Sequence, residues 1–442
     1  MSELDFEPVL EQIEAADSIR VCGRVTDVIG LVIEGNGPGL PIGGLCSIER
    51  RVPGAQIEPV EAEVVGFRRN RVLLMPLGEV RGIEPGNRIV VRGTSPAVPV
   101  GPKLLGRVLD GLGRPLDGKG PLQPDTTTPL HGEAINPMDR APIREPLDLG
   151  VRAMNALLTC GRGQRLGIFA GSGVGKSTLL GMISRSTEAD VNVIGLIGER
   201  GREVREFIEK DLGPEGMART ILVVATSDQP PLVRIRGAHL ATAIAEYFRD
   251  RGGHVMLMMD SLTRLAMAQR EIGLSIGEPP SSRGYTPSVF ALLPRVLERA
   301  GVTEKGSITG LYTVLVDGDD MNEPIADASR GLLDGHIVLS RALANEGHFP
   351  AIDVLSSLSR LMPDIANEGQ MQAAHRVRTW LSTYRDARDL IDIGAYTAGT
   401  NPHIDEAVAH RDPVSQFLRQ PVHEKANLED SAAGLAALAG GA

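Results

Sequence analysis

The 442-residue sequence contains few aromatic residues and few cysteines, and its charge is not basic. Aromatic residues make up 3% of the chain, with Trp380 the single tryptophan, so the core must be built mainly from Leu, Ile, Val and Ala. The three cysteines, Cys22, Cys46 and Cys160, are far apart and form no C-x-x-C pair, which argues against a disulfide framework or a zinc site. This cysteine usage indicates a reduced, cytosolic compartment.

Targeting and membrane-spanning segments are also missing. The first residues, MSELDFEPVLEQIEAAD, are acidic and lack the basic region of a signal peptide. No apolar run approaches the roughly 18 residues that a membrane-spanning helix needs. The formal net charge of −10 argues against a broad nucleic-acid surface. We therefore expect a cytosolic protein without a nucleic-acid partner, which other proteins would have to hold at any membrane where it works.

The chain is long enough for two or three domains, and its first segment differs from the rest. In residues 1–18, the apolar residues Phe6, Val9, Leu10 and Ile13 recur at helical spacing among acidic residues. Such a stripe is typical of a helix that packs on its own domain. It is also typical of a helix that docks a partner protein.

The remaining sequence changes its pattern twice. Residues 19–97 hold short β-rich runs broken by Gly and Pro, such as EAEVVGFRRNRVLLMPLG, which predict a small barrel or sandwich. In residues 98–363, apolar runs such as RLGIFAG and HVMLMMDS alternate with helical stretches, which predicts an α/β domain with a parallel sheet buried on both faces. Residues 364–442 have a helical pattern, and their low-complexity end, AAGLAALAGGA, predicts a frayed terminus.

The most specific motif is AGSGVGKST, from Ala170 to Thr178. It follows an apolar strand pattern and precedes a helical run, which is the context that a phosphate-binding loop needs. The glycines let backbone N–H groups turn towards phosphate oxygens, and the helix N-terminus adds a favourable dipole. Lys176 would reach the β- and γ-phosphates, and the Ser177 hydroxyl would ligate Mg²⁺. The strict motif has Gly at the position of Ala170, whereas the relaxed motif accepts either residue.

The residues that we expect to bind the phosphates of ATP are Gly171, Ser172, Gly173, Val174, Gly175, Lys176, Ser177 and Thr178.

Two carboxylates follow predicted strands. Asp260 ends the run HVMLMMD, where P-loop enzymes place an acid that holds the Mg²⁺ shell, here through water. Glu199 follows the apolar run Val191–Leu196, and the C-terminal ends of parallel strands face the ligand crevice. Glu199 is therefore a candidate for orienting and polarising the attacking water. A run of mixed Glu and Arg is equally typical of a salt-bridged helix start, so the spacing leaves both interpretations open.

At these motifs the chain resembles the family of rotary F-type ATPase subunits. The matching segments are GSGVGKST, the GER segment at Glu199 and PAIDVLSSLSR, which fits the pattern P-x-x-D-x-x-x-S-x-S. The resemblance covers about residues 20–420. It implies an N-terminal β-barrel, a RecA-like P-loop core, a C-terminal helical domain and a hexameric ring.

Longer stretches are similar to the type III secretion branch of that family. They include GERGREVREFIEKDLG, DSLTRLAMAQREIGLSIGEPP and GDDMNEPIADASRGLLDGHIVLSR. The flagellar export ATPase is the closer match, although the injectisome ATPase shares nearly all of these stretches. The resemblance implies Mg²⁺-dependent ATP hydrolysis by a homohexamer that energises or primes protein export.

The resemblance also implies roles for individual residues. Lys176 and Glu199 would act in catalysis, and Arg200 and Arg264 would approach the γ-phosphate. Arg360, directly after the S-x-S signature, would be an arginine finger that reaches into a neighbouring subunit. Phe349 would stack on adenine, where relatives often have Tyr. From the residues alone, Arg360 is also typical of a structural ion pair.

The implied partners are a stator-like negative regulator at the N-terminal helix, a central coiled-coil stalk, the membrane export gate, and export substrates with their chaperones. These partners imply a position at the inner membrane without insertion into it. Three other functions compete: a proton-driven rotary ATPase subunit, a non-catalytic ring subunit and an RNA-translocating hexamer. The secretion-type stretches count against the first. The second typically has Gln at the position of Glu199, and the acidic composition without aromatic-basic motifs disfavours the third.

Overall fold

A computed structural model describes residues 22–50, 58–93, 96–316, 318 and 320–440. The chain divides into two compact units, Met1–Pro96 with Leu274–Glu278, and Ala97–Gly273 with Pro279–Ala442. The expected N-terminal helix of residues 1–18 lies outside the described residues, and the four-domain division stays a prediction. Among the described residues, no helix combines the length and the apolar character that crossing a membrane requires.

Six strands of the first unit close into a barrel, which confirms the expected fold of this region. Their order is β1-β2-β5-β4-β3-β6, and β1 also pairs with β6, so the barrel has no free edge. Inward-facing aliphatic residues such as Val25, Ile33 and Ile89 fill the interior. The strands are β1 (Cys22–Ile29), β2 (Val32–Asn36), β3 (Leu45–Arg50), β4 (Glu58–Arg68), β5 (Arg71–Pro76) and β6 (Arg88–Gly93).

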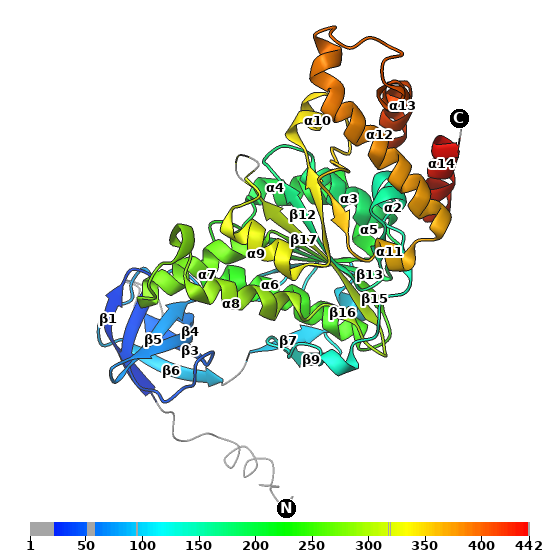
Figure 1. The fold of residues 1–442 in the computed structure, drawn as a ribbon. Helices are drawn as coiled ribbons and strands as arrows, with labels where there is room; N and C mark the ends of the chain where they lie inside the picture. The colour runs from blue at the N-terminus through cyan, green and yellow to red at the C-terminus, as the bar shows by residue number, and fades with distance from the viewer. Residues whose placement is uncertain (1–21, 51–57, 94–95, 317, 319, 441–442) are drawn as a thin grey trace, which may run out of the picture. The chain divides into compact units, whose positions relative to one another are not determined.

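The second unit is built on a nine-stranded sheet, which confirms the predicted parallel core (Figure 1). Seven strands pair in parallel, whereas β16 and β19 pair antiparallel with β17 and β18. In spatial order the main path is β19 (Leu358–Ser359), β18 (Gly335–Leu339), β12 (Arg165–Ala170), β17 (Ser307–Leu315), β15 (His254–Asp260), β13 (Val191–Ile197), β14 (Thr220–Ala225) and β8 (Val108–Asp110), and β16 (Gly301–Val302) extends beside β17.

Helices cover both faces of this sheet, because its strands are apolar on both faces. Figure 1 shows α6, α8 and α9 on one side and α2, α3 and α5 on the other. The helices of this layer are α2 (Arg152–Leu157), α3 (Lys176–Ser186), α4 (Gly201–Glu206), α5 (Gly213–Ala218), α6 (Pro231–Arg249), α7 (Leu262–Ile276), α8 (Pro287–Leu297), α9 (Pro324–Leu332), α10 (Arg341–Asn345) and α11 (Met362–Ile365). Two short ribbons, β7 (Ala97–Val100) with β9 (Thr126–Pro129) and β10 (Pro146–Leu147) with β11 (Cys160–Gly161), complete the unit.

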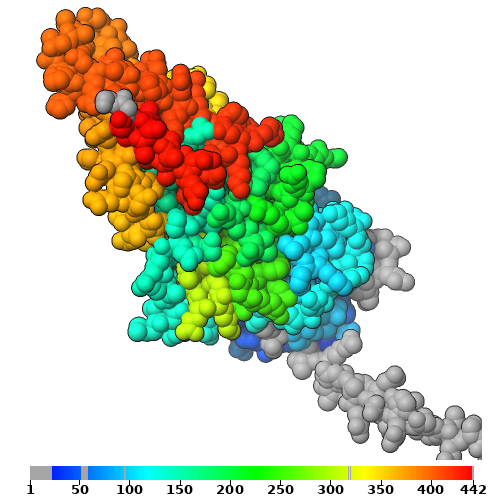
Figure 2. Space-filling view, turned by 90° about the vertical axis from the view of Figure 1, so that its right-hand side faces the viewer, coloured from blue at the N-terminus to red at the C-terminus, as the bar shows by residue number. Residues whose placement is uncertain are grey.

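Three helices form the C-terminal part, namely α12 (Glu368–Asp392), α13 (Pro402–Leu418) and α14 (Leu428–Gly440). The Trp380 ring of α12 stacks on the His410 ring of α13, with 3.8 Å between ring centroids. The prediction of a frayed terminus is wrong for α14, whose Leu435 is fully buried in the same core as the central sheet. Figure 2 shows α14, in red, lying against the surface of the neighbouring segments. Small residues spaced along one face let this helix pack closely.

A buried ion pair ties α6 to the end of α8. Arg299 is 1% exposed, and its guanidinium donates two hydrogen bonds to the Glu246 carboxylate, at 2.8 and 2.6 Å. The same guanidinium also donates to the Leu130 carbonyl oxygen at 3.2 Å. A buried charge is tolerated only when its partners satisfy it, so the pair fixes how these segments pack.

Arg299→Met is expected to lower the free energy of unfolding by about 3–5 kcal/mol, because the Glu246 carboxylate would stay buried without its partner. Urea unfolding followed by circular dichroism and by the fluorescence of Trp380 measures the change. In the control variant Arg299→Met with Glu246→Gln, the unpaired charge is gone and part of the stability should return. A loss below about 1 kcal/mol in the single variant would contradict this role.

Candidate functional site

The glycine-rich loop connects β12 to α3 at the C-terminal edge of the sheet. Ala170 is the last residue of β12, where its carbonyl oxygen accepts from Val316 N–H at 3.1 Å. Extended backbone needs no glycine, which explains why Ala is accepted at this motif position. Gly173 and Gly175 have φ values of +79° and +92°, where residues with a side chain are strained. These two glycines therefore give the loop its inward turn ahead of the N-terminus of α3.

Three charged side chains meet beside this loop. The Lys176 Nζ atom lies 3.2 Å from Glu199 Oε1 and forms a short contact with Asp260 Oδ1. The sheet register explains the meeting, because Leu196 of β13 pairs with Asp260 of β15 and Glu199 lies two residues after the end of β13. The sheet thus brings together three residues that the sequence predicts for one site.

A fourth residue, which the sequence analysis missed, fixes the carboxylate. Thr313 of β17 donates its hydroxyl to Asp260 Oδ1 at 2.6 Å. Its signal in the sequence is a hydroxyl within an otherwise apolar strand run, which is weak because such a hydroxyl is commonly satisfied by backbone.

Burial and charge shift the pKa values of this cluster. Burial first, and then the charge of Asp260, raise the pKa of Glu199 to about 7, against the attraction of Lys176. Burial works against the charge of Lys176, but Asp260 and Glu199 outweigh it and raise the pKa of the lysine above its usual value. The lysine is therefore a permanent cation, whereas Glu199 changes its charge near neutral pH.

The loop and its surroundings have the features that a nucleotide phosphate chain and a cation need. Ser177 is exposed in the first turn of α3, where its hydroxyl can reach a metal ion. The ring of Phe349 is 45% exposed and lies 3.6 Å from the position that a Cβ atom on Gly175 would occupy. Arg264 has a buried Nε atom without a hydrogen-bond partner among the described residues. These groups fit an anion that would contact the loop and the arginine.

The two predicted arginines near Glu199 lie differently. The Arg264 side chain packs against Gly198, the residue before Glu199, where a Cβ atom would come within 2.6 Å of the Arg264 Cβ atom. The Arg200 side chain is 68% exposed and pairs with Glu203 at 3.4 Å. Arg264 is therefore part of the site wall, whereas Arg200 points towards solvent.

Two other residues of the loop contact groups outside the site. The Ser172 carbonyl oxygen accepts from Arg341 Nη1 at 3.2 Å, which ties the loop to α10. The Thr178 hydroxyl bonds to Asp211. The remaining predicted residues, Gly171 and Val174, are buried in the loop and present only backbone to a ligand.

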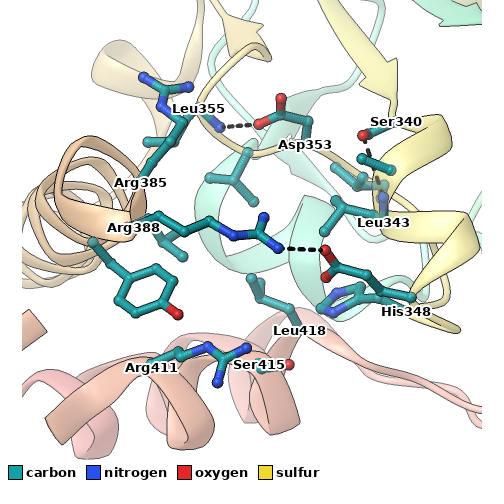
Figure 3. Close-up of a pocket in the computed structure, with 16 residues that line it drawn as sticks. Ser340, Leu343, His348, Asp353, Leu355, Arg385, Arg388, Arg411, Ser415 and Leu418 are labelled. Carbon is teal, nitrogen blue, oxygen red and sulfur yellow. Dashed lines mark hydrogen bonds and ion pairs between the residues drawn. The ribbon is translucent and has the colours of Figure 1, made fainter. Parts of the chain in front are cut away.

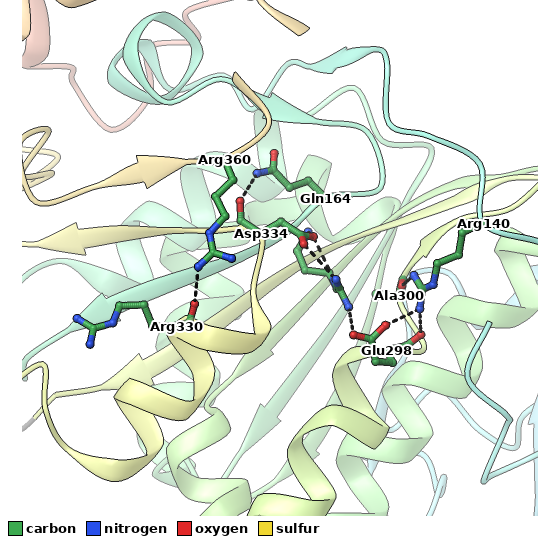
Figure 4. Close-up of polar contacts among 8 residues, drawn as sticks. Arg140, Gln164, Glu298, Ala300, Arg330, Asp334 and Arg360 are labelled. Atoms are coloured by element: carbon green, nitrogen blue, oxygen red, sulfur yellow. Dashed lines mark hydrogen bonds and ion pairs between the residues drawn. The ribbon is translucent and has the colours of Figure 1, made fainter. Parts of the chain in front are cut away.

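Arg360 does not join this cluster within one chain. It follows β19, whose Ser359 pairs with Gly335 at the start of β18, whereas the glycine loop follows Ala170, which pairs with Leu339 at the end of β18. Four residues of strand, about 13 Å, separate the two positions. Figure 4 shows the Arg360 guanidinium donating to the Arg330 carbonyl oxygen, a hydrogen bond of 3.2 Å, and the side chain forms no ion pair among the described residues.

Comparison with known proteins gives three family matches along the chain. Residues 150–359 match the nucleotide-binding domain of the ATP synthase alpha/beta family, and residues 25–93 match the beta-barrel domain of that family. Residues 366–437 match the C-terminal domain of the T3SS EscN ATPase.

Individual relatives match over almost the whole length. The "Flagellum-specific ATP synthase" of Bacillus subtilis is 57% identical, with 98% of this chain and 99% of the relative covered. The "Type 3 secretion system ATPase" of Xanthomonas euvesicatoria is 51% identical, with 92% of each covered. The solved structure of the assembled ATPase EscN with its central stalk EscO, from enteropathogenic E. coli, is 43% identical with a TM-score of 0.86, covering 94% of this chain and 100% of that one.

The fold and the site define a P-loop nucleotide-binding protein with a lysine and two carboxylates beside the loop. The sequence identities of 57% and 51% to these relatives are far above what a shared fold alone produces. The chain belongs to the ATP synthase alpha/beta family, among its flagellum-specific and type III secretion ATPases. It is therefore an ATPase.

Gly198→Ala is expected to reduce ATP turnover at least tenfold, because the new Cβ atom would collide with Arg264 at a backbone position of φ +76°. Turnover would fall because Arg264 and the adjoining Glu199 are displaced. A catalytic group misplaced by about 1 Å can lower the reaction rate 10²-fold. Phosphate release at saturating ATP measures it. Gly201→Ala is the matched control, since a Cβ atom there meets nothing within 4 Å. Equal activity of the two variants would contradict the packing role of Gly198.

Proposed function

We propose that this chain hydrolyses ATP with Mg²⁺ in a homohexameric ring, and that the ring energises or primes protein export through a type III, flagellar, secretion apparatus. Unfolding of export substrates or release of their chaperones is the work that hydrolysis would drive. The observation that carries the proposal is the Lys176–Glu199–Asp260 cluster beside the glycine loop. Similarity to flagellum-specific and secretion ATPases, which extends over 92–98% of this chain, supports the export role.

Substrate binding would use the loop and its lysine. Lys176 would leave its two carboxylates and pair with the β- and γ-phosphates, while the backbone N–H groups from Gly171 to Thr178 surround the phosphate oxygens. Ser177 directly, and Asp260 through water, would hold Mg²⁺, which neutralises charge on the phosphates. The Thr313 hydroxyl keeps Asp260 in place for that role. Phe349 would stack on the adenine ring.

Hydrolysis would depend on Glu199 and on arginines. As a carboxylate, Glu199 would orient the attacking water and polarise it towards the γ-phosphorus. Arg264, whose Nε atom is buried and unpartnered among the described residues, would bind the charge that develops on the γ-phosphoryl group. Arg200 points towards solvent in this structure, so its side chain would have to turn inward to approach the same group. Little covalent help is needed, because phosphoryl transfer depends mainly on positioning and charge neutralisation.

Arg360 would complete the site of a neighbouring subunit. Its exposure and its distance from the loop of its own chain support a role in trans. An arginine finger supplied in this way can accelerate hydrolysis by about 10³–10⁵. A lone subunit would then be nearly inactive, and assembly of the ring would switch the enzyme on.

One proposed partner is supported by a solved relative, and the others come from the family resemblance alone. EscN was solved with a central stalk, and we propose a coiled-coil stalk for this ring as well. A stator-like negative regulator at residues 1–18, the membrane export gate, and chaperone-bound substrates would be the other partners. The enzyme would work in the cytoplasm, held at the inner membrane by that gate. Three flagellum-specific relatives are 53–57% identical, whereas the two secretion relatives are 50–51% identical, which supports a flagellar apparatus, although two other flagellum-specific relatives are 48% identical.

Mixing two inactive variants tests the shared site. Glu199→Gln and Arg360→Ala should each lose at least 10²-fold in turnover. In a 1:1 mixture, about a quarter of random interfaces combine an intact Glu199 with an intact Arg360 of the next subunit, so that fraction of activity should return. The measurement is phosphate release against protein concentration.

The matched control is a mixture of Glu199→Gln and Lys176→Ala, which remove residues from the same site of one chain. A Glu199→Gln chain keeps Lys176 but lacks the carboxylate, and a Lys176→Ala chain keeps Glu199 but lacks the lysine, so every site is defective whichever chain is its neighbour, and no activity should return. Recovery in both mixtures, or in neither, would contradict the proposed role of Arg360 in trans.

The raised pKa of Glu199 predicts a pH dependence. Because the carboxylate must be ionised to polarise water and its pKa is about 7 rather than 4.5, kcat/KM should fall as the pH drops below about 7. Well below that pH, the decline approaches about tenfold for each pH unit. The profile is measured at saturating Mg²⁺, with Glu199→Gln as the comparison, whose residual activity should lack this limb. A plateau that extends down to pH 5 would exclude this role for Glu199.

A further inference from the structure

Arg360 is exposed, and it follows a strand that is too short to fix its direction. The strand β19 has two residues, Leu358 and Ser359, which pair with His336 and Gly335 at the start of β18. A residue that acts on a neighbouring subunit needs a defined starting position, because a misplacement of about 1 Å can lower a reaction rate 10²-fold. Contacts outside the strand pairing must therefore hold this arginine.

Both the backbone and the side chain of Arg360 have such contacts. The backbone N–H donates to the Asp334 carbonyl oxygen at 3.0 Å. The guanidinium donates to the Arg330 carbonyl oxygen at 3.2 Å (Figure 4). Arg330 lies in α9 and Asp334 directly precedes β18, so both acceptors belong to the segment that leads into β18. The position of this segment sets the position of Arg360.

Gln164, which is fully buried just ahead of β12, joins the two strands that flank Arg360. Its Nε2 atom donates to the Asp334 carbonyl oxygen at 2.9 Å, which is the same oxygen that accepts from the Arg360 backbone. It also donates to the Ser359 hydroxyl at 3.1 Å, and that hydroxyl donates to the Thr159 carbonyl oxygen at 2.7 Å. One side-chain amide thus holds the residue before Arg360 and the acceptor of its backbone N–H.

Arg165, the first residue of β12, holds the Asp334 carboxylate. It donates its backbone N–H and its Nε to Oδ2, at 3.0 and 3.1 Å, and its Nη2 to Oδ1 at 3.0 Å. The register of β12 with β18 begins only at Gly167 and His336, so this ion pair fixes the chain ahead of the strand pairing. Two parallel hydrogen bonds between an arginine and a carboxylate are strong and directional.

The far side of the Arg165 guanidinium is fixed as well. Its Nη1 atom lies 2.6 Å from Glu298 Oε1, and Arg140 pairs with the other oxygen of that carboxylate at 2.7 Å (Figure 4). Burial opposes the charge of Arg165, but the carboxylates of Asp334 and Glu298 outweigh it and raise the pKa of the guanidinium. Arg165 therefore stays charged, and it lies in a row of alternating charges that ends at Asp334.

The loop that leads into β19 is also internally bonded. The Asp353 carboxylate accepts from Leu355 N–H at 3.0 Å (Figure 3) and from the N–H and the hydroxyl of Ser356, at 3.2 and 2.7 Å. The Ser357 hydroxyl donates to the Asp353 carbonyl oxygen at 2.6 Å. The signature P-x-x-D-x-x-x-S-x-S thus forms a fixed loop that ends at Arg360.

We propose that Asp334 and Gln164 are positioning residues for Arg360, which they align for its action on the ATP site of the neighbouring subunit. Neither residue would touch the nucleotide. Asp334, fixed by Arg165, supplies the acceptor for the Arg360 backbone, and Gln164 holds that acceptor together with Ser359. The arginine would then enter the neighbouring site with its backbone already in place. This role rests on the proposed function, in which Arg360 acts in trans.

Asp334→Asn should lower kcat at least tenfold and change KM for ATP by less than about threefold, because Arg360 loses its alignment while the glycine loop of each chain stays intact. The new amide would place a donor against the Arg165 guanidinium, which has only donors. Gln164→Met, which has a side chain of similar length without the donated hydrogen bonds, should act in the same direction. Phosphate release at varied ATP concentration measures kcat and KM.

The Arg360→Ala background separates positioning from a general structural effect. If Asp334 acts only through Arg360, then Asp334→Asn combined with Arg360→Ala should turn over ATP as slowly as Arg360→Ala alone. A further loss of about tenfold in the double variant would overturn the proposal, because Asp334 would then support something other than the arginine. Gln164→Met in the same background decides the question if Asp334→Asn does not fold.

Mixing of chains tests on which side of the interface Asp334 acts. Asp334→Asn mixed 1:1 with Glu199→Gln should regain about a quarter of wild-type turnover, since that fraction of random interfaces combines an intact Glu199 with an aligned Arg360. Asp334→Asn mixed with Arg360→Ala should regain none, because neither chain offers an aligned arginine. Recovery with Arg360→Ala instead of Glu199→Gln would overturn the proposal.

Arg140→Gln is the matched control. Arg140 belongs to the same row of charges and donates to Glu298 and to the Ala300 carbonyl oxygen, but it forms no hydrogen bond or ion pair with Asp334 or Gln164 in the described part of the chain. The variant should lower the unfolding midpoint and keep kcat within about twofold of the wild type. A loss of kcat as large as that of Asp334→Asn would overturn the positioning role.

The single variant Arg360→Ala keeps the two proposals apart. If it turns over ATP at the wild-type rate, the proposed function is wrong about the arginine in trans, and the positioning role fails with it. If it loses turnover but its combination with Asp334→Asn loses more, the arginine in trans stands and only the positioning role fails.

Discussion

The arrangement of the second unit depends on one constraint: three charged groups must share a partly buried space at the end of a parallel sheet. Lys176 can stay ionised there only because Glu199 and Asp260 lie against it, and the carboxylates are held there by adjacent strands. Desolvation makes the charges expensive, so their mutual attraction must offset that cost. A nucleotide could replace this pairing, because its phosphates can pair with the lysine and its bound cation can pair with the carboxylates. The charges that hold the cluster together are therefore the ones that suit its ligand.

The sheet also places the glycine loop and Arg360 at different positions along its strands. Its C-terminal edge carries the glycine loop and the two carboxylates, while the chain reversal after β19 leaves Arg360 towards the other end of β18. A single subunit thus presents the glycine loop and its charged cluster at one edge of the sheet and an exposed arginine elsewhere. Beyond β18, the segment with His348 and Phe349 lies between the ATP site and the C-terminal helices.

Local sequence patterns predicted much of this structure. Strands β4 and β5 of the barrel, β12 and β15 of the central sheet and the glycine loop could all be predicted from runs of residues, because each depends on a short apolar or glycine-rich pattern. The helix α14 could not, since its small residues are weak signals in isolation and Leu435 becomes buried only against other segments. Thr313 was missed for a related reason: a lone hydroxyl in a strand gains a role only when a neighbouring strand places Asp260 beside it.

The sequence by itself determined that a phosphate-binding loop exists, which lysine and hydroxyl it offers, and which carboxylates end the neighbouring strands. These features are local, because a turn, a helix start and a strand end depend on few consecutive residues. Only the tertiary structure decided which of those groups meet: Glu199 and Asp260 reach Lys176, Arg264 forms part of the wall, and Arg360 does not join them. The reason is physical. Strand register and order fix distances between residues far apart in the chain, and no local pattern encodes those distances.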